Sequence, residues 1–93
     1  MKKENLISIF DTAILMKDDI AVEITVPGQE TTEVIITRAE NLENKLEFYK
    51  KAYDENGIHC MNKDVKIVDA WCVNFFEMYD NKNGALFTSK KEV

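Results

Sequence analysis

The sequence predicts a small α+β fold in two layers: an antiparallel sheet of three to five strands packed against two helices, in the order α-β-β-α-β(-β-β). Two stretches carry apolar residues at the three- and four-residue spacing of amphipathic helices, and two others alternate apolar and polar residues as half-buried strands do. A proline-glycine turn separates the two alternating stretches. With 93 residues and 45% hydrophobic content, the chain predicts one domain that spans 1–93.

The first helix is expected over residues 4–17. Its apolar residues share one wide face, and its exposed side carries few charges. The residues of the apolar face are Leu6, Ile7, Ile9, Phe10, Ala13, Ile14 and Met16. Asp18 and Asp19 follow, and adjacent aspartates are typical of the turn that ends a helix.

A β-hairpin is expected next. Residues 20–26 alternate β-branched and smaller or polar side chains, which predicts a strand with one buried face made of Ile20, Val22, Ile24 and Val26. Pro27 and Gly28 occupy the second and third positions of a type II turn. The second strand, at residues 33–37, returns antiparallel, but the loop up to Thr31 is too long to specify the register.

The second helix is expected to begin at the Thr37-x-x-Glu40 spacing of a capping box and to run to about residue 54. Acidic residues precede basic ones along it, as the helix dipole favours, and Asn56-Gly57 predicts its end. One apolar stripe follows helical spacing, and it consists of Ala39, Leu42, Leu46, Tyr49 and Tyr53.

A third strand is expected over residues 65–73, where β-branched and aromatic residues alternate only weakly and so indicate burial on both faces. Residues 74–79 fit no period well, and a strand is the preferred interpretation because a turn at 80–84 and a return strand at 85–88 follow. The tail at 89–93 is expected to fray.

No residue pattern predicts a catalytic, cofactor or metal site. His59 is the only histidine, and the adjacent Cys60 points the opposite way in an extended chain, which does not suit a Cys-His nucleophile pair. With Cys72 these residues supply three possible zinc ligands at spacings that match no usual pattern, so reduced thiols are expected. The turn at 80–84 departs from a calcium loop, and the glycines are too isolated for a phosphate loop.

The charge distribution favours binding to a protein with a basic surface. The net charge is -5, whereas residues 18–47 carry eight acids and two bases, or -6, which leaves +1 for the remainder. Such a field repels nucleic acid and anionic lipid. The candidate contact residues are Glu30, Glu33, Glu40, Glu43 and Glu47. The alternative is an acidic face that serves solubility alone.

The sequence predicts a cytoplasmic protein, because no apolar run approaches the ~20 residues of a membrane span and the opening residues lack a signal-peptide pattern. Five of the nine aromatic residues are concentrated in the last third, where they form core or supply one or two binding anchors. They are Trp71, Phe75, Phe76, Tyr79 and Phe87. An alternative role is therefore a homo-oligomeric structural protein that assembles through this third or through the tyrosine stripe.

Two segments carry a resemblance to known proteins. Residues 19–28 (DIAVEITVPG) and 41–53 (NLENKLEFYKKAY) resemble small uncharacterised accessory proteins of phages and prophages of Gram-positive bacteria. In size, charge and α+β make-up the chain is also similar to small acidic anti-CRISPR proteins, which occupy a basic surface of a CRISPR effector. The resemblance implies a non-enzymatic protein that binds a host or phage protein. A structural or morphogenesis role is the alternative, and a small enzyme is less favoured.

Overall fold

The structure, a computed structural model, describes residues 1–73. The expectations for residues 74–79, 80–84, 85–88 and 89–93, with four of the five C-terminal aromatics, lie outside the described residues. The described elements are helix α1 (Lys3–Met16), strand β1 (Asp19–Thr25), strand β2 (Thr32–Thr37), a 3-10 turn (Ala39–Asn41), helix α2 (Leu42–Ala52) and strand β3 (Ile67–Val73).

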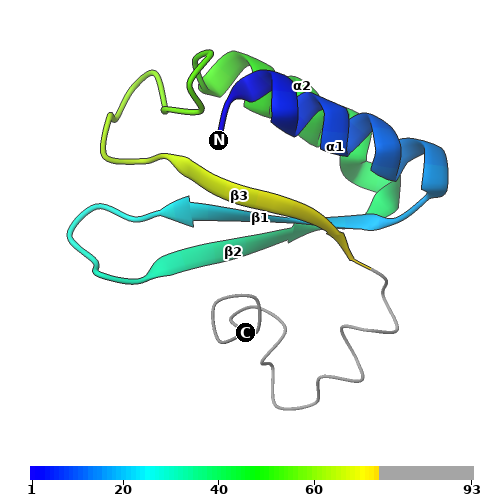
Figure 1. Cartoon of the computed structure of the whole chain (residues 1–93), viewed down its shortest axis with the longest axis horizontal. Helices are drawn as coiled ribbons and strands as arrows, with labels where there is room; N and C mark the ends of the chain where they lie inside the picture. The colour runs from blue at the N-terminus through cyan, green and yellow to red at the C-terminus, as the bar shows by residue number, and fades with distance from the viewer. Residues whose placement is uncertain (74–93) are drawn as a thin grey trace.

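The elements form two layers, as the sequence predicts. The sheet is antiparallel with strand order β2-β1-β3, so β1 is central. Both helices lie on one face of the sheet (Figure 1). The described residues therefore confirm a small α+β fold, with a strand count at the low end of the predicted range. Neither described helix is long and apolar enough to cross a membrane.

The pairing register decides which side chains face the helices. Val22 lies opposite Ile35 on one side and Ala70 on the other, and all three project toward the helical layer. The residues next to them, such as Ala21 and Glu23, project to the second face of the sheet, yet both are buried. The expectation of a half-buried β1 was wrong because β1 is flanked by a strand on each side.

The core lies between the helices and the helix-facing side of β1 and β3. Its buried members include Leu6, Phe10, Ala13, Ile20, Val22, Leu42, Leu46, Tyr49, Tyr53, Ile67 and Ala70. The two predicted helical stripes are thus confirmed in most positions, with two exceptions. Ala39 lies in the 3-10 turn before α2, outside the core. Met16 is exposed because it projects roughly a quarter-turn from the centre of the buried α1 stripe.

The predicted turn of the hairpin is confirmed. Gly28 has a positive φ of 77°, and the N–H of Gln29 donates to the carbonyl of Val26 at 3.1 Å, which closes a type II turn. Strand β3 begins at Ile67 rather than at residue 65, and Val68 is exposed. The expectation that β3 is buried on both faces was wrong at Val68, which the β1–β3 register shift between Ile67 and Asp69 leaves without a partner in β1.

The predicted capping box does not form. Thr37 remains in β2, where it pairs with Ile20, and neither the 3-10 turn nor α2 has a side-chain cap. The N–H of Ala39 instead donates to Asp19 Oδ1 at 2.8 Å. Thr37, the predicted helix cap, is therefore part of β2. The carboxylate of Asp19, distant in sequence, accepts a backbone N–H at the start of the 3-10 turn instead.

Helix α2 ends at Ala52, two residues earlier than expected, because Tyr53 adopts an extended conformation and forms a bridge with His59. Asp54 then organises the loop: its Oδ1 accepts hydrogen bonds from the N–H groups of Asn56 and Ile58, at 2.8 Å and 3.0 Å. The positive φ of the next glycine belongs to this loop rather than to the helix end.

Candidate protein-binding surface

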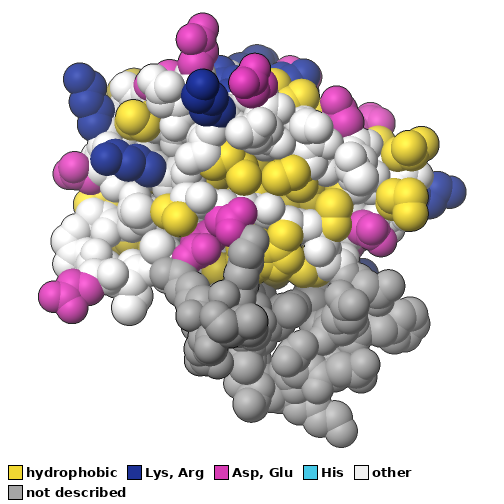
Figure 2. Space-filling view, in the orientation of Figure 1, with side chains coloured by type: hydrophobic (Ala, Val, Ile, Leu, Met, Phe, Trp, Pro, Cys, Tyr) yellow, Lys and Arg dark blue, Asp and Glu magenta, His cyan; other side chains and the backbone are white. Residues whose placement is uncertain are grey.

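Two large hydrophobic side chains are exposed together where α1 ends. Leu15 is 81% exposed and Met16 is 64% exposed. Figure 2 shows hydrophobic side chains at the end of the molecule where Figure 1 places the C-terminal end of α1, with charged side chains beside them. Single exposed hydrophobic residues are common on proteins, but two adjacent ones at the end of a helix form a candidate contact surface.

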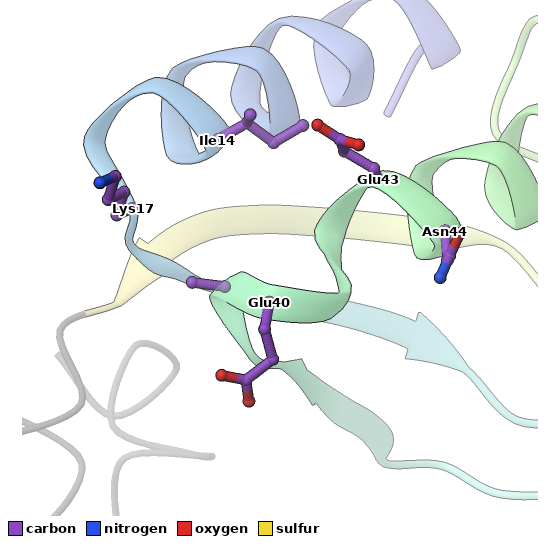
Figure 3. Close-up of a pocket in the computed structure, with 6 residues that line it drawn as sticks. Ile14, Lys17, Glu40, Glu43 and Asn44 are labelled. Atoms are coloured by element: carbon purple, nitrogen blue, oxygen red, sulfur yellow. The ribbon is translucent and has the colours of Figure 1, made fainter.

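A cavity of about 480 Å³ lies between the end of α1 and the start of α2. Its lining consists of Ile14, Lys17, Ala39, Glu40, Glu43 and Asn44. In Figure 3, Glu43 points across the gap toward Ile14, whereas Glu40 points away from it. We call the lining residues together with Leu15 and Met16 the helix-end surface. Its carboxylates lie apart on the rim, which suits several basic groups of a partner better than one bound ion.

The way α1 ends exposes the hydrophobic pair. Lys17 takes a left-handed conformation with φ of 58°, and the N–H of Asp18 bonds back to the carbonyl of Ala13 at 3.0 Å. This closes the helix and directs the chain into β1. Leu15 lies on the side of α1 opposite the buried stripe, so nothing in the helix layer covers it.

Asp19 holds the two sides of the cavity in place. Its buried carboxylate accepts the hydrogen bond from Ala39, and its Oδ2 lies 3.4 Å from Arg38 Nε. That distance gives an electrostatic contact rather than a hydrogen bond, and Oδ2 has no hydrogen-bond partner among the described residues. The first residue of β1 is thus tied to the segment that opens α2, and this tie fixes the chain on both sides of the cavity.

The structure brings together two of the five glutamates that the sequence selects. Glu40 and Glu43 belong to the helix-end surface. Glu47 is exposed further along α2 and pairs with Lys50 at 3.7 Å, an exposed contact that contributes little. Glu30 and Glu33 lie at the hairpin end of β2, roughly 20 Å away at ~3.3 Å per residue. The five residues therefore do not form one acidic patch.

A second cavity, of about 460 Å³, lies at the other end of the helix layer. It is lined by Lys2, Lys3, Glu4, Ile7, Glu55 and Asn56. Lys3 uses both its main chain and its side chain here: its N–H donates to the carbonyl of Glu55 at 2.9 Å, and its Nζ donates to the carbonyl of Lys50 at 2.8 Å. These bonds join the start of α1 to the end of α2, so the cavity borders a structural joint.

The histidine and the two cysteines, which are the residues best suited to catalysis or metal binding, do not form a common site among residues 1–73. The Nδ1 of His59 accepts the N–H of Met61 at 3.0 Å, and its ring packs edge-on against Tyr53 at 5.1 Å. Cys60 and Cys72 are free thiols. Burial raises the pKa of the Cys72 thiol, and a nearby aspartate charge raises it further. Within residues 1–73 no three potential metal ligands come together.

The tyrosine stripe is not available as an interface. Tyr49 and Tyr53 are buried, and their rings pack against each other with centroids 5.5 Å apart. Burial raises the pKa of both hydroxyls, and the neighbouring Tyr53 raises that of Tyr49 further. Assembly through this stripe was a wrong expectation, because helical spacing alone does not distinguish a core stripe from an interface stripe.

Sequence reasoning missed Leu15 as a surface residue and placed Met16 in the core. The available signal was the scarcity of charge on the exposed side of α1, where Leu15 stands at a position that the helical period turns outward. Comparison with protein-family models, with curated proteins and with solved structures gave no match for this chain.

Proposed function

We propose that this protein is a non-enzymatic phage or prophage accessory protein that binds a host or phage protein with a basic surface, and that the helix-end surface is the contact. The observation that carries the proposal is the joint exposure of Leu15 and Met16 at the end of α1, the same helix end that borders the cavity lined by Glu40 and Glu43. Inhibition of a host defence nuclease, such as a CRISPR effector, is the specific form that we favour.

The hydrophobic pair supplies the energy of such a contact. Fully burying a leucine or methionine side chain is worth roughly 1.5–3 kcal/mol. A few well-buried side chains usually carry most of the energy of an interface. Leu15 and Met16 are the two most exposed large hydrophobic residues of the described α1, so a partner gains most by covering them.

The carboxylates of Glu40 and Glu43 would orient a basic partner and increase its rate of association. Glu40 and Glu43 line the cavity between α1 and α2, where basic residues of a partner would meet them after partial desolvation. Charges placed in this way accelerate encounter and disfavour acidic partners more than they add affinity. The net charge of -5 extends the same preference over a longer range.

Two further observations support the proposal. The resemblance of residues 19–28 and 41–53 to phage and prophage accessory proteins falls on β1 and α2, which form much of the core. In addition, the described histidine and cysteines have structural contacts or lie apart from one another, which favours binding over catalysis.

The proposal is tested by comparing partner capture for two variants. Leu15→Asp combined with Met16→Asp removes the hydrophobic pair, whereas Met61→Asp makes a similar change at a residue that is 88% exposed in the loop after α2. Tagged proteins are used to recover partners from host cells, which mass spectrometry then identifies. The proposal predicts a protein recovered by the wild type and by Met61→Asp but lost with the double variant, with purified components reproducing the difference. Equal recovery by all three contradicts it.

A further inference from the structure

Strand β2 forms an open edge of the described sheet. It pairs only with β1 among residues 1–73, and the register runs without interruption from Thr32 to Thr37. The other edge strand, β3, has a register shift where it meets Glu23 and Ile24 of β1. Such irregularities discourage edge pairing, and β2 has none.

The composition of β2 does not blunt this edge, which no segment within residues 1–73 pairs with. Its six residues read TEVIIT, with one charge, no lysine and no proline. Proteins usually blunt an edge strand with lysine, proline, a bulge or a covering segment. The three central apolar residues, Val34, Ile35 and Ile36, are only half-buried. An added strand would cover them and satisfy the outward backbone groups.

A second copy of the chain fits this edge. A two-fold axis perpendicular to the sheet makes the two β2 strands antiparallel and keeps the helices of both copies on one face. Because opposed side chains point to the same face, the axis must lie midway between one residue and its own copy. With the axis at Val34, Arg38 of each copy, which is half exposed and also lies 3.4 Å from Asp19 of its own chain, would stand opposite Glu30 of the other just beyond the ends of β2. With the axis at Ile35, Arg38 would stand opposite Thr32 instead. Charge complementarity therefore selects the axis at Val34.

We infer that two copies of this chain pair through β2 around Val34, so that their sheets join into one antiparallel sheet. The inference goes beyond the proposed function, and none of the residues that pair, 30–38, belongs to the helix-end surface. The assembly presents two helix-end surfaces on the same side of the joined sheet. It can thus bind two sites of a symmetric partner at once.

Cross-linking at the two-fold axis tests the register. Residues directly opposite in an antiparallel pair have Cβ atoms about 4.5–5.5 Å apart, close to disulfide distance. In a background with the exposed Cys60 changed to serine, Val34→Cys is expected to give a covalent dimer on mild oxidation. Thr31→Cys, at an exposed position of the hairpin loop, lies roughly 20 Å from its copy and should remain monomeric.

The reversible dimer is measured in parallel on the full chain by light scattering up to about 1 mM protein. Val34→Lys places two ammonium groups opposite each other and should raise the dimer Kd at least about tenfold. Val68→Lys, a matched change on exposed β3, should leave it unchanged. A monomeric wild type throughout, or equal cross-linking of both cysteine variants, overturns the inference. Partner capture by the helix-end surface is unaffected by that result, so the two proposals fail independently.

Discussion

The N–H of Ala39 donates a 2.8 Å hydrogen bond to Asp19 Oδ1, so the first residue of β1 also anchors the turn that precedes α2. The two residues are 20 positions apart in the chain. Because Asp19 lies three residues after the end of α1, the bond holds the end of α1 near the start of α2 at the helix-end surface. The stability of the fold and the shape of the candidate site therefore depend on the same carboxylate.

Replacing Asp19 with alanine should destabilise the protein by about 1–3 kcal/mol, because the substitution leaves a partly buried N–H without its acceptor and removes the charge beside Arg38. Urea unfolding followed by circular dichroism measures the change. Asp18→Ala is the control, because Asp18 is adjacent to Asp19 but its side chain makes no described hydrogen bond. We expect this variant to lose less than about 0.5 kcal/mol of unfolding free energy. Equal losses for both would contradict the anchoring role.

Gly57 and Gly28 provide a matched pair of substitutions. Both have positive φ, at 75° and 77°, so alanine is strained at each. A Cβ at Gly57 would lie 2.1 Å from the carbonyl oxygen of Met1, whereas a Cβ at Gly28 meets no atom within 4 Å. We expect Gly28→Ala to cost about 1 kcal/mol and Gly57→Ala at least about 2 kcal/mol more. Thermal unfolding of the two variants compares them directly, and similar midpoints would show that the Met1 contact is not maintained in solution.

Tyr49→Phe should leave the stability unchanged or increase it by up to about 1 kcal/mol. The hydroxyl of Tyr49 is buried and has no hydrogen-bond partner among the described residues, so its removal relieves a desolvation cost. The ring itself packs edge-on against Phe10 at 5.7 Å. Tyr49→Ala should therefore cost about 3–5 kcal/mol, as loss of a large core side chain does. A clear destabilisation by Tyr49→Phe would reveal a partner for the hydroxyl.

Stability should fall in alkaline solution. Burial raises the pKa of Tyr49 and Tyr53 above the ordinary 10.0, so the folded state holds these protons more tightly than the unfolded state does. The stability is then constant below pH 10.0 and decreases as the pH rises above it, because only the unfolded chain ionises. Ultraviolet titration in a Tyr79→Phe background reports these two tyrosines alone. Ionisation of both near pH 10.0 without unfolding would contradict their burial.

Reversing the charges of Glu40 and Glu43 to lysine should weaken partner binding by about fivefold to thirtyfold and reduce its dependence on salt. The control changes Glu55 and Asp64, two exposed acids away from the helix-end surface, to lysine. It makes the same change in net charge at another place. Calorimetry or interferometry at low and high salt separates the two effects. If the control weakens binding equally, the contact depends on net charge rather than on the helix-end surface.

The sequence by itself determined the elements that depend on local periodicity. The stripes of α1 and α2 and the Pro27-Gly28 turn were predicted with nearly correct positions. These features follow from the geometry of one segment: helical spacing places apolar residues on one side, and a turn type demands a glycine at one position. The two-layer α+β class follows because amphipathic helices and strands must bury their apolar faces against each other.

Only the tertiary structure decided how these segments meet. The β1–β2 register placed Val34 and Ile36 on the second face of the sheet, and no local signal specifies that offset. Thr37, the predicted helix cap, pairs with Ile20 in the sheet, and the carboxylate of Asp19, distant in sequence, accepts the N–H of Ala39 instead. The candidate site arose in the same way: charge composition selected five glutamates, but packing placed only Glu40 and Glu43 at the cavity between α1 and α2 and left the others elsewhere. Periodicity records which side of a segment is buried, whereas a site depends on which segments pack together.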